Sequence, residues 1–124
     1  MKICYKVDID PIPQARPRFG KNGTYQPPRC KQYKALVKSA AQAAMDGREP
    51  LTGELNCQIK VFRKFKPTSR RYGDVDNHIK SILDGMNGIV YLDDCQIVRC
   101  SIEKGTAKTP HIEVILTDDR KENV

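Results

Sequence analysis

DVDNHIK at residues 74–80 and YLDD at residues 91–94 are the two stretches around which this chain is organised. Five acids lie from Asp74 to Asp94, and Lys80 is the only Lys or Arg among them, although the whole chain carries a formal net charge of +7. Closely spaced carboxylates repel one another, and Mg²⁺ takes hard oxygen ligands. An acidic segment in a basic chain therefore predicts a bound Mg²⁺ facing a phosphate polymer.

The residues between the two stretches have the spacing of an amphipathic helix, expected over residues 77–87 with Asp76 as its N-cap and Asn87–Gly88 as its end. A second helix is expected over residues 31–45. The apolar stripe of the first comprises Ile79, Ile82, Leu83 and Met86, and that of the second comprises Tyr33, Leu36, Val37, Ala40 and Ala44.

Alternating apolar residues predict four strands, at residues 3–9, 55–61, 96–103 and 111–117. Their inward positions include Cys57, Ile59, Val98, Cys100, Ile102, Ile112, Val114 and Leu116. A turn at residues 105–110 is expected between the last two strands. The order β-α-β-α-β-β then predicts an α+β fold, with two helices packed on a mostly antiparallel sheet.

A single domain spanning residues 1–124 is expected from the chain length. Residues 11–28 hold five of the eight prolines, so they cannot form a regular helix or a central strand. We expect a basic, proline-rich excursion there, a loose hairpin with its tip at Asn22–Gly23 and with Phe19 and Tyr25 on either side. The polar tail at residues 118–124 is expected to fray.

The acid pairs have several interpretations. In an extended chain Asp74 and Asp76 would point the same way, and a turn after the helix could return the Asp93–Asp94 corner toward them. Alternatively, Asp76 is only a helix cap, Asp93 and Asp94 are turn formers, and Lys80 pairs with Asp76 at i,i+4. A calcium-binding EF-hand is excluded, because its sixth and twelfth positions would be Ile79 and Gly85 instead of Gly and Glu.

Basic residues are segregated from the acids. No acid lies between Asp10 and Asp46 or between Glu54 and Asp74. Such segments are typical of surfaces that grip phosphates, and arginine forks between prolines suit that task. The candidate DNA-binding residues are Arg16, Arg18, Lys21, Arg29, Lys64, Lys66, Arg70 and Arg71.

Other residues point away from alternative chemistries. The five cysteines form no CxxC pair, which favours a chain with reduced thiols and a cytoplasmic location. Neither His78 nor His111 has a spacing that favours metal ligation. No apolar run approaches the roughly 20 residues of a membrane-spanning helix.

Taken together, the quoted motifs resemble the RusA family of Holliday-junction resolvases over about residues 9–116. The resemblance rests on GDVDN at residues 73–77, Lys80, Leu83–Asp84, Asn87–Gly88 and DDCQI at residues 93–97, with Arg16-Pro17-Arg18 similar to the leading loop of the family. Tyr91 stands where a Trp often precedes the acid pair, and the turn after the helix is short.

The resemblance implies a small dimeric endonuclease of the kind often carried by phages and prophages. It implies that Asp74, Asp76 and Asp94 are metal ligands, that Asp93 is a weaker candidate, and that Lys80 is the essential basic residue. The function expected is Mg²⁺-dependent cleavage of four-way DNA junctions by a homodimer, with no membrane and no small-molecule substrate.

Two other functions stay open. One is a non-catalytic nucleic-acid-binding module, and the other is a general metal-dependent nuclease acting on flaps or branched DNA.

Overall fold

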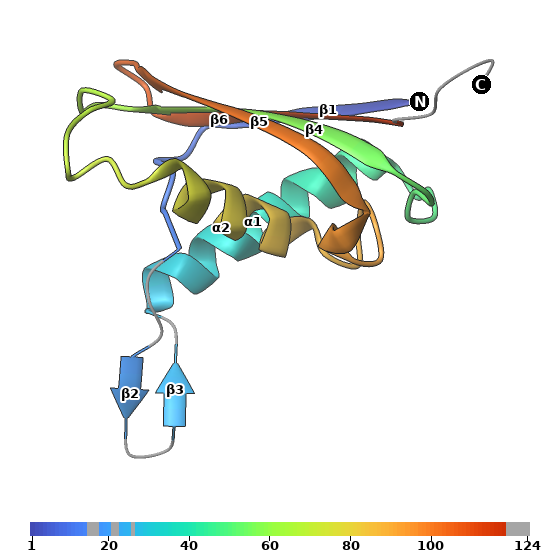
Figure 1. Ribbon diagram of the computed structural model, residues 1–124, viewed down its shortest axis with the longest axis horizontal. Coiled ribbons are helices and arrows are strands. Elements are labelled where there is room, and N and C mark those ends of the chain that lie inside the picture. Colours follow the sequence, from blue (N-terminus) through green and yellow to red (C-terminus); the bar gives the residue numbers. More distant parts are fainter. Residues whose placement is uncertain (15–17, 21–22, 26, 119–124) are drawn as a thin grey trace.

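Two helices cover one face of a four-stranded sheet in the computed structural model (Figure 1). The structure describes residues 1–14, 18–20, 23–25 and 27–118. Strands β1 (Lys2–Val7), β6 (His111–Asp118), β4 (Leu55–Arg63) and β5 (Ile97–Thr106) lie side by side in that order, and the helices are α1 (Pro28–Met45) and α2 (Val75–Met86). The α+β class, the single domain and the order of the main elements are confirmed.

The sheet is mixed. β1 pairs with β6 and β6 with β4 in antiparallel fashion, whereas β4 and β5 are parallel and are joined through α2. A crossover helix brings the chain back to the end of the sheet where the previous strand began, so the two strands run the same way. The connection from β5 to β6 covers residues 107–110, because β5 extends through the first two residues of the expected turn. It does not close a hairpin, because β4 lies between β5 and β6.

The core lies between the sheet and the two helices. Inward residues of β4 and β6 are fully buried as expected, and Ile82 and Met86 of α2 pack against them. Three tyrosines, Tyr33, Tyr72 and Tyr91, are also fully buried. The inward residues of the two central strands are Leu55, Cys57, Ile59, Val61, Ile112, Val114 and Leu116.

Two expected core positions are wrong. Val98 is 50% exposed, because the β4–β5 register shifts between Leu55 and Asn56, which pair with Ile97 and Arg99. The extra residue turns outward, and Cys100 takes up the inward phase. In α1, Leu36 is 47% exposed, because the buried stripe is Cys30, Tyr33, Val37, Ala41 and Met45.

A small hairpin projects from the body of the molecule beyond the start of α1 (Figure 1). It consists of β2 (Arg18–Gly20) and β3 (Gly23–Tyr25), paired antiparallel with Arg18 opposite Tyr25. This confirms the hairpin predicted in the proline-rich segment. Asn22 and the polar tail at 119–124 lie outside the described residues.

All five cysteines are free thiols. Within the described parts of the chain, no helix is long and apolar enough to cross a bilayer.

Candidate functional site

The first acid pair lies at the start of α2. Asp74 is the N-cap, in an extended conformation, and its side chain makes no capping hydrogen bond. The helix begins at Val75, and the His78 amide donates to the Asp74 carbonyl at 3.1 Å, so Asp76 belongs to the first turn and the prediction that it is the N-cap is wrong. Both acids are exposed, and the positive end of the helix dipole favours carboxylates there.

The backbone just before Asp74 is fixed by three basic side chains. The Tyr72 carbonyl accepts from Arg63 Nη1 at 2.8 Å and from His78 Nε2 at 2.7 Å. The Gly73 carbonyl accepts from Lys104 Nζ at 3.1 Å. Because these donors come from β4, α2 and β5, the position of Asp74 is set by the body of the fold.

His78 is fully buried on the inner side of α2. A carbonyl only accepts, so Nε2 carries the proton and donates to Tyr72. Nδ1 is buried and has no hydrogen-bond partner in the described structure. Desolvation lowers the pKa of His78, and the charges of Arg63 and Lys104 act in the same direction. The neutral ring therefore acts as a structural donor.

Gly73 lets a proline-containing segment pack closely against the start of α2. Its φ of +95° is a left-handed conformation, and a Cβ there would lie 2.7 Å from Pro13 Cγ and 3.0 Å from His78 Nε2. The same segment is tied to α2 by the Gln14 amide, which donates to the Asn77 carbonyl at 2.9 Å. Only glycine satisfies both the conformation and the close approach.

A pocket of about 430 Å³ opens between the start of α1, residues 12–14 and the start of α2. Asp74 and Asn77 line it from α2, Arg29 lines it from α1, and Arg70 lines it from the loop after β4. The structure thus brings two of the expected DNA-binding arginines to the same pocket as Asp74. Arg29 and Arg70 are both exposed there.

The remaining expected DNA-binding residues are more scattered. Lys64, Lys66 and Arg71 are exposed on the loop after β4, with the Arg71 guanidinium 4.5 Å from the centre of the Phe65 ring. Arg18 lies on β2 of the projecting hairpin. Arg16 and Lys21 lie outside the described residues.

The second acid pair begins the short 3-10 helix η1 (Asp94–Gln96). Asp93 Oδ1 accepts the Cys95 amide at 3.1 Å, and Gln96 Oε1 accepts the Asp93 amide at 3.3 Å, which is a capping box. The Cys95 amide, followed by the contact with Asp94, lowers the pKa of Asp93. Asp93 therefore has a capping role of its own, and Asp94 is the better candidate for chemistry.

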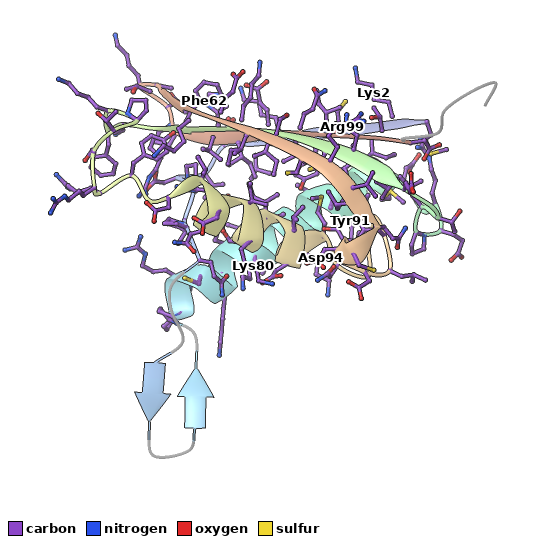
Figure 2. All side chains as sticks on the ribbon, in the orientation of Figure 1. Lys2, Phe62, Lys80, Tyr91, Asp94 and Arg99 are labelled. Atoms are coloured by element: carbon purple, nitrogen blue, oxygen red, sulfur yellow. The ribbon has the colours of Figure 1, made fainter. Side chains whose placement is uncertain are left out.

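The structure does not bring the two acid pairs together. Among the residues it describes, no group of three or more His, Cys, Asp or Glu side chains could hold a metal ion. Asp74 precedes α2 and Asp94 follows it, and a helix of 12 residues is about 18 Å long. Figure 2 shows Asp94 beyond the C-terminal end of α2, with Lys80 partway along the helix. The Asp93–Asp94 corner does not come back toward Asp74 and Asp76, because α2 is a crossover between two parallel strands.

Lys80 pairs with a residue to which the sequence interpretation gave no role. Its Nζ lies 3.2 Å from Asp84 Oδ1, one helical turn further on, instead of pairing with Asp76. Asp84 Oδ2 in turn lies 3.2 Å from Lys34 Nζ on α1. The spacing of four residues between Lys80 and Asp84 was a signal for this pair in the sequence, whereas Lys34 is 50 residues away from Asp84.

Comparison with known proteins identifies the family. Residues 8–117 match the family model described as Endodeoxyribonuclease RusA. The chain belongs to the RusA family. As a RusA-family protein it is also similar to the uncharacterized protein YqaN of Bacillus subtilis (strain 168), with 28% identity covering 93% of this chain and 96% of that protein.

Membership in the RusA family, whose model describes an endodeoxyribonuclease, raises the question of whether Mg²⁺ fits the residues. In proteins Mg²⁺ is usually held by one or two carboxylates, with substrate phosphates and water as the other ligands. Asp74 and Asp76 fit that donor set, because both are exposed and neither carboxylate accepts a hydrogen bond within the described part of the chain. Asp94 does not belong to it in this arrangement.

Proposed function

We propose that this protein is a Mg²⁺-dependent endonuclease that cuts four-way DNA junctions. The observation that carries the proposal is the pocket at the start of α2, where Asp74 meets Arg29 and Arg70 in a chain of the RusA family. Arginines bind phosphate through paired hydrogen bonds, and a divalent ion offsets repulsion between acids and DNA. One strand of the junction would lie in this pocket.

Each residue has a distinct task in this mechanism. Asp74 and Asp76 would hold Mg²⁺, which would supply electrostatic stabilisation of the phosphodiester under attack. Arg29 and Arg70 would hold the neighbouring phosphates and fix the register of the strand. Lys80, on the exposed side of α2, would place a positive charge near the phosphate as negative charge develops there. We propose that Asp94 also takes part in DNA cleavage, although α2 separates it from Asp74 and Asp76 along the chain.

Junction cleavage also suggests how the protein assembles and where it works. A four-way junction must be cut on two opposed strands, and a homodimer with twofold symmetry supplies two equivalent sites. Choice of branched DNA would depend on backbone shape and charge more than on base edges. The five free thiols suit a reducing cytoplasm.

The deciding experiment measures cleavage of a labelled four-way junction with and without Mg²⁺. Asp76→Asn should abolish cutting while leaving junction binding intact, because the change removes a carboxylate charge and not a phosphate contact. Asp46→Asn is the matched control: Asp46 caps the far end of α1 in a left-handed conformation that Asn tolerates. Parental cutting by Asp76→Asn would refute the catalytic assignment.

The same experiment separates the two alternatives. Junction binding without Mg²⁺-dependent cutting would indicate a non-catalytic binding module. Equal rates on linear, flap and four-way substrates would indicate a general nuclease. The separation of the acid pairs makes the first alternative worth testing directly.

A further inference from the structure

Asp84 lies between two lysines that come from different helices. Lys80 Nζ is 3.2 Å from Oδ1, and Lys34 Nζ is 3.2 Å from Oδ2. The side chains of Asp84 and Lys34 are 22% and 17% exposed, whereas that of Lys80 is 56% exposed. Asp84 is therefore anchored to α1 through Lys34, and Lys80 is the partner at the solvent side.

The charges of the three side chains do not cancel. One carboxylate between two ammonium groups leaves a net charge of +1, so the cluster keeps a cation available to a phosphate. A pair made of Asp84 and Lys80 alone would be neutral. The contact of Lys34 is with the other carboxylate oxygen, so it holds Asp84 against α1 independently of Lys80.

The helix geometry allows Lys80 to serve two positions. Asp76, Lys80 and Asp84 are spaced by four residues and share one side of α2. Each step along the helix covers about 6 Å, which is within the reach of a lysine side chain. The ammonium group that contacts Asp84 in the free protein can therefore approach a phosphate held near Asp76.

We propose that Asp84 is a positioning residue for Lys80, with Lys34 as its anchor. The inference rests on the proposed function, because Lys80 is assigned there to the phosphate. Asp84 does not touch the DNA in this scheme. It holds the Lys80 side chain on the correct side of α2, partway to its working position, and Lys34 preserves the net positive charge of the cluster.

The test combines substitutions of Asp84 and Lys80. Asp84→Asn should lower kcat on a four-way junction by about ten- to hundredfold, a typical effect of misplacing a working group, with junction binding unchanged. Asp84→Glu should restore part of the rate. In a chain that already carries Lys80→Gln, adding Asp84→Asn should have no further effect. If the reductions in kcat caused by the two substitutions instead multiply, Asp84 does not act through Lys80 and the proposal is wrong.

Lys34→Gln tests the anchor. It should also lower kcat without weakening junction binding, because Lys80 would then form a neutral pair with Asp84. Lys38→Gln is the matched control, since Lys38 is an exposed lysine one turn further along α1. Thermal unfolding of each variant identifies any loss of fold. Equal rates for Lys34→Gln and the parental protein would refute the anchoring role.

A second readout does not depend on cutting. Lysines labelled with ¹³C-methyl groups give separate NMR signals, and Lys80→Arg identifies the Lys80 signal by its loss. Adding junction DNA with Ca²⁺ should move the Lys80 signal more than the Lys34 signal, and Asp84→Asn should move the Lys80 signal in the free protein. A protein that fails to cut but shows these changes refutes only the proposed function. A Lys80 signal that responds to neither refutes the positioning role.

Discussion

Arg63 grips Asp10 through both carboxylate oxygens, with Nε 3.0 Å from Oδ1 and Nη2 3.1 Å from Oδ2. The same guanidinium donates to the carbonyls of Arg71 and Tyr72, and its side chain is only 6% exposed. Arg63 lies in the second acid-free interval, which was interpreted as a phosphate-gripping surface. In the fold it joins β4 to the segment after β1 and to the backbone that leads into Asp74.

Arg63→Lys should therefore destabilise the protein strongly, although it keeps the charge. An ammonium group cannot reproduce the planar fork, and each lost hydrogen bond to a charged group contributes about 1.5–3 kcal/mol before screening by solvent. We expect a loss of at least about 2 kcal/mol in the free energy of unfolding, measured by urea denaturation. Asp10→Asn should cost less, because Asp10 is 46% exposed. The reverse order would show that the carboxylate is the more important partner.

Gly73→Ala should destabilise the fold through a specific clash. The added Cβ would meet Pro13 at 2.7 Å, and the left-handed φ of +95° adds strain of about 1–3 kcal/mol.

Gly53→Ala is the control for that clash. Gly53 has a similar φ of +83° but nothing within 4 Å of the added Cβ. The difference between the two losses in urea denaturation measures the clash alone. Equal losses in the free energy of unfolding would mean that the segment around Pro13 moves aside at little energetic cost.

The two acids of the Asp93–Asp94 pair should respond differently to amide substitution. Asp93→Asn should keep both fold and cutting, because Asn caps helices as well as Asp does. Asp93→Ala should lose the cap, which stabilises a helix by about 1 kcal/mol. Asp94→Asn should keep the fold and lose cutting if Asp94 takes part in the reaction. Cleavage assays paired with thermal unfolding distinguish the three variants, and full activity of Asp94→Asn would remove that residue from the site.

Arg29 and Arg70 should each contribute to the salt dependence of junction binding. Replacing either with Ala should reduce the slope of log affinity against log salt by about 0.7–0.9, the value for one phosphate contact. Arg48→Ala is the control, because Arg48 lies just past the opposite end of α1, where it contacts Met1. If the slope of log affinity against log salt is unchanged in both variants, the DNA strand does not bind in this pocket.

The fold could be predicted from the sequence wherever one periodicity extended through an element. β6 and α2 follow simple apolar patterns. The predicted inward residues of β6 are buried, and of the predicted α2 stripe Ile82 and Met86 are buried, whereas Ile79 and Leu83 are partly buried. Val98 could not be placed, because a β-bulge shifts the phase and leaves no local signal. The parallel pairing of β5 with β4 was also not predicted, because the sequence indicated only a turn at residues 105–110 and a mostly antiparallel sheet.

The candidate site was predicted only in part. Asp74, Arg29 and Arg70 share one pocket, which agrees with an acid site flanked by basic segments. The Tyr72 and Gly73 contacts with Arg63, His78 and Lys104 involve residues scattered along the chain. No spacing in the sequence predicts such contacts, because they depend on how β4, β5 and α2 pack.

If the protein binds branched DNA as proposed, the parallel β4–α2–β5 unit would fix the spacing between two contact points on the nucleic acid. The two acid pairs are separated along the chain by α2, whose 12 residues are about 18 Å long, and successive base pairs of a duplex are about 3.4 Å apart. A duplex arm lying along α2 would therefore meet the pairs at positions roughly five base pairs apart. Contacts with Asp74 and with Asp94 would report on different nucleotides of the same arm, so footprints from the two ends would be offset by half a turn.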